Sequence, residues 1–507
     1  LFLNKSIISS GSKESTESAA EILFAGGNAY DATIAGILMS MVAEPGLTSP
    51  GGGGFLLAYP ESRKPKLFDF FVNMPNKKIQ DPDFFQVEVD FGDSQQQFHI
   101  GKGSVAVPGT IAGLFHIHKK LGKIPFKEIA SPAIESAKKG IKLNCFQEYV
   151  FKILEPIFCH TERGRSLFCI NNNLMKEDDI FRMPDFADFL DTLSIEGVDF
   201  FYKGEISDII LNAQSNGGLL QRQDLDQYKV IERDPIVTNF YDHHILSNPP
   251  MAVSGILIDF TLKLLNLKHS YQSKITLSDL AYAFEVTNMA REKHIHKPAD
   301  YINFNTVFES YKDIYIKQIE QHSIGGFPEN RFGSTTHISV IDKYGNASSA
   351  TTTNGEGCGS ILSKAGFMMN NMLGEEDLNP DGFFLHPPGT RLPTMMAPTI
   401  VLKDGKPVFV TGSAGSNRIR SVIIQMIVNT LCNGMDLVQS TDSPRIHIEG
   451  NILHAEPGVP DDELDKLSKH FKIKKWHDKN VFFGGCNSVM NDKGAGDPRR
   501  RGYTVTV

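Results

Sequence analysis

The chain lacks the local signatures that mark a nucleic-acid binder, a membrane protein or a metalloprotein. Its 507 residues carry a net charge of -8 and contain no dense block of Lys or Arg, which argues against binding to a phosphate backbone. No uninterrupted apolar run reaches the roughly 18 residues that a membrane span requires, so we expect no membrane association. The six cysteines include no C-x-x-C pair and no metal-like spacing. We therefore expect no metal and no cofactor.

The first residues carry neither Met nor the apolar segment of a signal peptide. Cysteine usage favours a reducing compartment, and we expect a cytoplasmic protein on that basis. A periplasmic or secreted location is the alternative if a leader has been trimmed.

The stretch 333–353 has the pattern of two β-strands joined by a tight turn. Thr, Val, Ile and Ser alternate on both sides of the turn, and Gly345-Asn346 supply the backbone angles that a hairpin needs. Antiparallel pairing would bring Thr335 close to Thr353. Strands followed by helices on both sides of this hairpin predict two sheets between helical layers.

The glycine run at 51–54 is the only stretch that suggests a phosphate cradle. No G-K-[ST] or G-x-G-x-x-G context surrounds it. We interpret it instead as a place where one backbone passes close to another at the edge of a sheet.

Two common hydrolase motifs, G-x-S-x-G and H-E-x-x-H, are missing from the sequence. A threonine hydroxyl is a poor nucleophile at its ordinary pKa and needs an adjacent base. Cleavage of the peptide bond before a threonine exposes an α-amino group with a pKa of about 7.7–8.0, which can accept the hydroxyl proton. Such a threonine supplies its own base, so we interpret His337, two residues beyond Thr335, as structural.

Segments along nearly the whole chain, in order, resemble the γ-glutamyltranspeptidase family of N-terminal-nucleophile hydrolases. They are residues 26–32, 51–55, 108–113, 217–220 with 224–225, 249–250 with 254–255, 335–340, 370–371, 397–400, 412–419 and 497–500. The resemblance implies an α/β (α+β) fold, a four-layer αββα sandwich.

The family also implies a precursor that cuts itself between Ser334 and Thr335. The products would be a large subunit, 1–334, and a small subunit, 335–507, that stay together as one domain. A higher homo-oligomer is left open.

Four positions carry the catalytic roles that the resemblance implies. Thr335 would be the nucleophile, and the hydroxyl of Thr353 would orient it. The backbone amides of Gly415 and Ser416 would form the oxyanion hole, a role that also suits two amides at the start of a helix.

The positions that would hold a γ-glutamyl group depart from the family pattern. Phe71 stands where the family has an arginine that grips the substrate's α-carboxylate, and a phenyl ring cannot pair with an anion. Arg391 would supply a cation from a different direction, or it is a surface arginine in a Pro-rich loop.

Further positions implied by the resemblance as substrate-binding also differ. Thr394 and Met395 replace two adjacent serines. Asn371 belongs to the matching Asn-Asn pair, and Glu375 stands where an aspartate binds the α-amino group. Glu375 would equally suit a solvated acidic edge, and Gly355 takes the place of an asparagine.

The leading hypothesis is a self-processing γ-glutamyltransferase-like amidohydrolase or acyltransferase. It would cleave a γ-glutamyl or related amide, such as glutathione, through a threonyl acyl-enzyme. One alternative is a cephalosporin-acylase-like amidase with a non-glutamyl substrate. The other is a non-catalytic homologue kept for binding.

Overall fold

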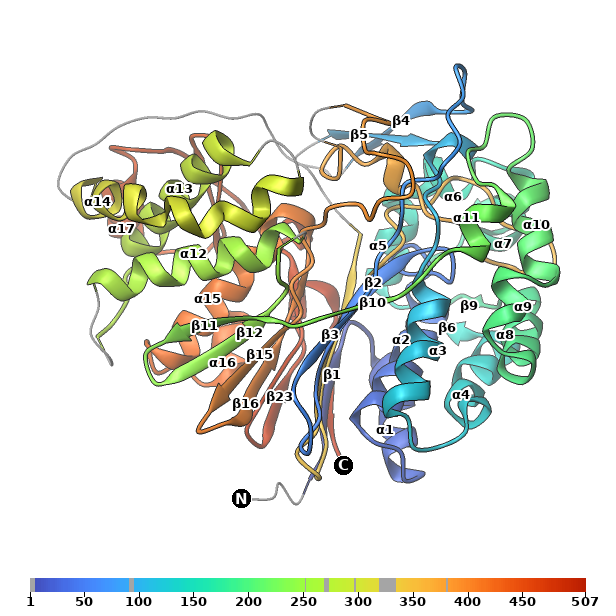
Figure 1. Ribbon diagram of the computed structural model, residues 1–507, viewed down its shortest axis with the longest axis horizontal. Coiled ribbons are helices and arrows are strands. Elements are labelled where there is room, and N and C mark those ends of the chain that lie inside the picture. Colours follow the sequence, from blue (N-terminus) through green and yellow to red (C-terminus); the bar gives the residue numbers. More distant parts are fainter. Residues whose placement is uncertain are drawn as a thin grey trace.

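Two β-sheets lie face to face between two layers of helices in the computed structural model, which describes residues 5–90, 95–250, 252–268, 273–295, 298–318, 334–379 and 382–507 (Figure 1). This is the αββα arrangement that the sequence predicted. In Figure 1 the sheets run through the centre of the molecule, and helices cover the outer face of each.

The first sheet is antiparallel throughout and holds the predicted hairpin at its centre. Its strands, in spatial order, are β10 (Ile231–Arg233), β3 (Lys66–Phe70), β2 (Gly53–Tyr59), β14 (Ala347–Thr353), β13 (Thr336–Ile341), β1 (Ile7–Ser10) and β24 (Tyr503–Thr506). Because β1 pairs with β24, the two ends of the chain meet in this sheet.

The second sheet is also antiparallel. It comprises β11 (Ile236–Phe240), β12 (His243–Ser247), β15 (Thr399–Lys403), β16 (Lys406–Thr411), β22 (Ser488–Met490) and β23 (Lys493–Ala495). The smaller sheets are β4 (Phe85–Asp90) with β5 (Gln95–Ile100), β6 (Ile141–Lys142) with β9 (Ile180–Phe181), β7 (Cys169–Ile170) with β8 (Asn173–Leu174), β17 (Ser413–Ala414) with β21 (Gly485–Cys486), and β18 (Ile446–Glu449) with β19 (Ile452–Ala455) and β20 (Lys472–Lys475).

The helices divide between the two outer faces (Figure 1). On the side of the first sheet lie α1 (Lys13–Phe24), α2 (Ala29–Ala43), α3 (Thr110–Leu121), α4 (Phe126–Lys139), α5 (Cys145–Ile153), α6 (Glu155–Phe158), α7 (Glu162–Phe168), α8 (Pro184–Glu196), α9 (Val198–Tyr202), α10 (Glu205–Ala213) and α11 (Arg222–Asp226). On the side of the second sheet lie α12 (Val253–Lys268), α13 (Leu277–His294), α14 (Phe308–Gln318), α15 (Ile419–Leu431), α16 (Leu437–Asp442) and α17 (Asp461–Leu467). In the part of the chain that the structure describes, no helix is long and apolar enough to cross a membrane.

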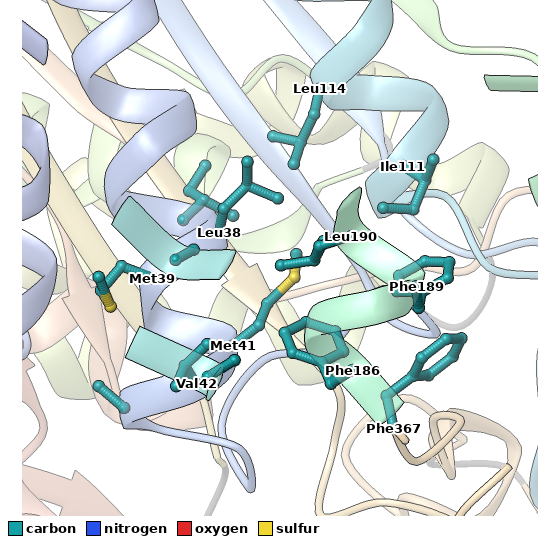
Figure 2. Close-up of a cluster of buried hydrophobic side chains, with 14 of the residues drawn as sticks. Leu38, Met39, Met41, Val42, Ile111, Leu114, Phe186, Phe189, Leu190 and Phe367 are labelled. Atoms are coloured by element: carbon teal, nitrogen blue, oxygen red, sulfur yellow. The ribbon is translucent and has the colours of Figure 1, made fainter. Parts of the chain in front are cut away.

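Alternation along the central strands divides the apolar side chains between two cores. Ile8 and Val340 pack with α1, α2 and α4, whereas Ile7 and Ile341 pack with the second sheet and its helices. Figure 2 shows the first core, where side chains of α2 meet those of α3 and α8 and the ring of Phe367.

Hydroxyl and imidazole groups fill the space between the sheets beside the hairpin. Ser339 donates to the carbonyl of Asn487 (2.9 Å), and Ser349 donates to the carbonyl of Thr411 (2.9 Å). His337 is buried between the hydroxyls of Thr351 and Ser339, which agrees with its interpretation as structural. These hydrogen bonds join the hairpin to the second sheet and fix its depth in the sandwich.

The glycine run lies inside the first sheet, so the expected position at an edge was wrong. β2 pairs with β3 on one side and β14 on the other, and Gly53 stands opposite Thr353. A Cβ on Gly52 would lie 2.2 Å from the carbonyl oxygen of Thr353, so no larger residue fits there. The close approach of backbones was correct, and it positions the end of β14.

Candidate active site

The hairpin register brings the two predicted threonines together. Thr336 pairs with Thr352, so Thr335 and Thr353 stand opposite each other at the end of the hairpin. Both line one pocket, which encloses about 350 Å³ of space including its open mouth. The residues that line it are Phe71, Ser334, Thr335, Thr353, Glu375, Leu378, Thr394, Met395, Met396, Ser416 and Ile419.

Thr353 holds the carbonyl group next to the predicted cleavage point. Its hydroxyl donates to the Ser334 carbonyl oxygen (2.5 Å) and accepts from the amide of Gly355 (3.0 Å). On the other side of the bond, Nη1 of Arg500 donates to the carbonyl oxygen of Thr335 (3.1 Å). Polar contacts therefore hold the carbonyl groups of both residues that flank the bond predicted to break.

The predicted oxyanion loop reaches the same pocket through Ser416. Gly415 and Ser416 begin a 3-10 turn (Ser416–Arg418) that continues directly into α15. The Ser416 hydroxyl donates to Asp377, and the Asn417 side chain donates to the same carboxylate (3.0 Å). Asp377 thus ties this loop to the segment that carries Glu375.

One wall of the pocket is apolar. Phe71 is fully buried and stacks on Phe55 with a centroid separation of 5.9 Å. Met395 and Met396 are buried beside it, and Thr394 accepts a hydrogen bond from the Met396 amide (3.2 Å). Among the described residues that line the pocket, none is a Lys, Arg or His. An acyl group in this pocket would meet hydrocarbon where the family pattern has a guanidinium.

The opposite edge of the pocket is acidic. Oε1 of Glu375 is buried and has no hydrogen-bond partner among the described residues. Burial, reinforced by the charges of Glu356 and Asp377, holds the pKa of Glu375 well above its ordinary value. Burial also raises the pKa of Glu356 to about 8. Glu375 therefore lies at the pocket and not on the solvated edge that was the alternative.

Gly355 and Glu375 fit each other. Gly355 has a φ of 61°, and a Cβ there would lie 2.1 Å from Oδ1 of Asn371 and 2.4 Å from Oε1 of Glu375. A larger residue at this position would therefore displace both side chains.

Arg391 does not reach the pocket, and its alternative placement on the surface is also wrong. Its side chain is 8% exposed, and its Nε lies 3.1 Å from Oδ1 of Asp69. Its other nitrogens donate to the hydroxyl of Tyr228 (2.8 Å) and to the carbonyl of Lys229 (2.8 Å), as well as to the carbonyl of Phe71. Asp69 also pairs with Arg233, so two guanidiniums share one buried carboxylate. Arg391 is a structural cation that holds the backbone at Phe71, just after β3.

Asn371 is likewise absent from the pocket wall. Its Oδ1 accepts from the amides of Glu356 (2.8 Å) and Gly357 (3.2 Å), and its Nδ2 donates to the carbonyl of His99 (3.3 Å). These hydrogen bonds stabilise the loop that follows Thr353.

The residues that sequence reasoning missed are Glu356, Asp377 and Arg500. Glu356 follows Thr353 by three residues between two glycines, and this proximity to the threonine predicted to orient the nucleophile was the available signal. Asp377 and Arg500 have no such local signal, because chain folding alone brings them to the site. Burial lowers the pKa of His337 to about 3, so it is neutral at physiological pH. In the described part of the chain, no group of three or more His, Cys, Asp or Glu could hold a metal ion.

Comparison with known proteins shows which family and which structures this chain is similar to. A profile of the gamma-glutamyltranspeptidase family matches residues 15–507. The chain is 29% identical to the glutathione hydrolase proenzyme of Escherichia coli (strain K12), over 97% of this chain and 90% of that protein. It is 27% identical to the capsule biosynthesis protein CapD proenzyme of Bacillus anthracis, over 96% and 88% respectively. The cephalosporin acylase from Bacillus halodurans superposes with a TM-score of 0.85 and 20% identity, covering 100% of this chain and 96% of that one.

The four-layer sandwich, the family profile and the similarity to a proenzyme relative together indicate an N-terminal-nucleophile hydrolase or acyltransferase. The profile match extends over almost the entire length of the chain. The chain belongs to the γ-glutamyltranspeptidase family.

Proposed function

We propose that the chain is a self-processing threonine amidohydrolase or acyltransferase whose acyl donor carries no α-carboxylate. The observation that supports this specificity is the pocket beside Thr335, where Phe71 forms part of the wall and no cationic side chain is among the lining residues. The family's enzymatic class supports the reaction type, and the chain shares its fold with the cephalosporin acylase from Bacillus halodurans.

Maturation would proceed by an acyl shift within the chain. The hydroxyl oxygen of Thr335 attacks the carbonyl carbon of Ser334, the carbon–nitrogen bond breaks, and the nitrogen takes up the proton. Water then hydrolyses the resulting ester, which leaves a carboxylate on Ser334 and a free hydroxyl and amine on Thr335. The hydrogen bond from Thr353 to the Ser334 carbonyl supports this role, because it draws electron density from the carbon to be attacked.

The two fragments, 1–334 and 335–507, would stay together after cleavage. The β13–β14 hairpin belongs to the second fragment but lies between β1 and β2 of the first. Separation would therefore break two strand interfaces in the centre of a buried sheet.

In turnover, the new α-amine takes the proton from the Thr335 hydroxyl as it attacks an amide substrate. The amides of Gly415 and Ser416 stabilise the oxyanion, and the amine returns the proton to the leaving nitrogen. Water or a second amine then takes the acyl group from Thr335.

Specificity would follow from the two walls of the pocket. Phe71 and the two methionines suit the methylene groups of an acyl chain, and Glu375 suits a hydrogen-bond donor or an ammonium group. A γ-glutamyl donor would bring its α-carboxylate into this pocket without a cation to receive it, and desolvation of an unpaired anion is unfavourable.

Intact mass and N-terminal sequencing test the maturation step. We expect fragments that correspond to 1–334 and 335–507, with the second beginning at Thr335, and a Thr335→Ala variant that stays uncut. A wild-type chain that remains whole and inactive under the same conditions would favour the non-catalytic alternative.

Four p-nitroanilides that differ only in head group test the specificity. They carry γ-glutamyl, glutaryl, 4-aminobutanoyl and butanoyl groups, so the α-carboxylate and the ammonium group vary independently. We expect the largest kcat/KM for the two donors without a carboxylate. A preference for the γ-glutamyl or the glutaryl anilide would contradict the proposal while leaving the self-cleavage untouched.

A further inference from the structure

Two side chains of one short segment hold Ser334, the residue whose carbonyl carbon must be attacked. The Ser334 amide donates to Oε1 of Glu356 (3.3 Å), and its carbonyl accepts from Thr353 (2.5 Å). Gly355, which lies between these two residues, donates its amide to the Thr353 hydroxyl (3.0 Å). The segment 353–356 therefore grips both polar groups of Ser334 at once.

Glu356 is itself held rigidly. It is fully buried, its backbone amide donates to Oδ1 of Asn371 (2.8 Å), and its Oε2 accepts from Nδ2 of the same residue (3.4 Å). The charged group that raises the pKa of its carboxyl is Asp377, and Glu356 in turn raises the pKa of Glu375. An uncompensated negative charge in such a place is unfavourable, so the carboxyl holds its proton at neutral pH.

We propose that Glu356 is a positioning residue for self-cleavage: it accepts the Ser334 amide hydrogen and so aims the Ser334 carbonyl at the hydroxyl of Thr335. This inference rests on the proposed self-processing and adds a residue to it. Glu356 neither gains nor loses a proton in the step. The bond from the Thr335 oxygen to the Ser334 carbon forms, the carbon–nitrogen bond breaks, and the proton moves from that oxygen to that nitrogen.

The neutral form of Glu356 is the one that suits this role. Attack on the Ser334 carbonyl places negative charge on its oxygen. This oxygen belongs to the same residue as the amide that donates to Glu356. An ionised Glu356 would repel that developing charge across a buried region, where screening is weak. Cleavage should therefore slow when the carboxyl loses its proton, at a pH near the raised pKa of about 8.

The test uses the full chain made by cell-free synthesis. The chain is then incubated at pH 6 to 9.5, and the first-order rate of cleavage is followed by gel and intact mass. Glu356→Gln keeps an acceptor oxygen but cannot ionise. Glu356→Met keeps the length but has no oxygen. Glu21→Gln is the matched control, because Glu21 is an exposed acid of α1 that does not line the pocket, and Thr335→Ala marks zero cleavage.

We expect Glu356→Met to cleave roughly threefold to tenfold more slowly at pH 7, the effect of one lost hydrogen bond. Glu356→Gln should cleave at pH 7 within about threefold of wild type, and the ratio of wild-type to Gln rates should fall about tenfold between pH 7 and pH 9. Glu21→Gln should leave the rate at pH 7 within about threefold of wild type.

Each of two results would overturn the role of Glu356 alone: a Met variant that cleaves as fast as wild type, or a ratio that stays constant with pH. If the Met variant fails to fold, as judged by protease resistance, the pH dependence of the Gln variant still decides. A wild-type chain that never cleaves would instead refute the self-processing itself, and this inference with it.

Discussion

Replacement of Phe71 by arginine should move the specificity of the pocket towards donors with an α-carboxylate. Phe71 lines the pocket beside Thr335 and Glu375, so a guanidinium there would face the acyl head group. The side chain is fully buried and stacks on Phe55, and removal of the ring should lower the free energy of unfolding by about 2–3 kcal/mol. Arg391, whose guanidinium contacts the Phe71 carbonyl, lies close enough to add some repulsion.

The gain for a carboxylate can be estimated from the contact that would form. A charge-assisted, bidentate arginine–carboxylate pair contributes about 1.5–3 kcal/mol. If that pair forms in the transition state, kcat/KM for the γ-glutamyl anilide should rise roughly 10- to 150-fold relative to the 4-aminobutanoyl anilide. The ratio of two substrates on one enzyme cancels any loss of folded protein.

The assay is the ratio of kcat/KM values for these two anilides, measured for wild type, Phe71→Arg and Phe71→Leu. The leucine variant removes the ring without adding charge, so its ratio should stay within about threefold of wild type. A folded arginine variant with an unchanged ratio would refute the placement of Phe71 against the acyl head group.

Three further perturbations follow from the packing around the site. Gly355→Asn should lower the free energy of unfolding by about 1–3 kcal/mol, because its Cβ would lie 2.1 Å from Oδ1 of Asn371 and 2.4 Å from Oε1 of Glu375; a variant as stable as wild type in denaturant melts would contradict the close packing at this position. Asp69→Asn should lower the free energy of unfolding by about 3–5 kcal/mol, because Arg391 would lose its buried carboxylate. A loss below about 1 kcal/mol would contradict that pairing. Burial lowers the pKa of His337 to about 3, so the unfolded chain takes up a proton below about pH 6.5 that the folded chain refuses. Stability should therefore fall with decreasing pH by about 1.4 kcal/mol per unit between these values from this residue, and His337→Gln should show a shallower slope in unfolding at pH 7, 6 and 5.

Local patterns carried the prediction of the central hairpin. Alternation and a Gly-Asn turn are properties of adjacent residues, so 335–341 and 347–353 were recognisable as paired strands, and their register followed. The order of helices and strands around them predicted the sandwich, because few architectures bury both faces of two sheets.

Long-range placement explains what was missed at the site. Arg391 lies in a Pro-rich stretch that reads as a surface loop, but Asp69, 322 residues earlier in the chain, draws its guanidinium into the interior. The glycine run is internal because β3 and β14 both pair with β2, and neither partner is encoded in the run. Glu356 contacts Ser334 only because the pairing of β13 with β14 brings the segment after Thr353 next to Ser334.

The sequence by itself determined the central hairpin and which residues stand at the proposed nucleophile and pocket positions, since each is a matter of which residue stands at a position in a local pattern. Tertiary structure alone decided which polar side chains can meet a substrate. Arg391 pairs with the distant Asp69 in the interior, and Glu375 keeps an unpartnered oxygen beside the pocket. The physical reason is that burial and pairing depend on neighbours in space, which the order of residues along the chain does not specify.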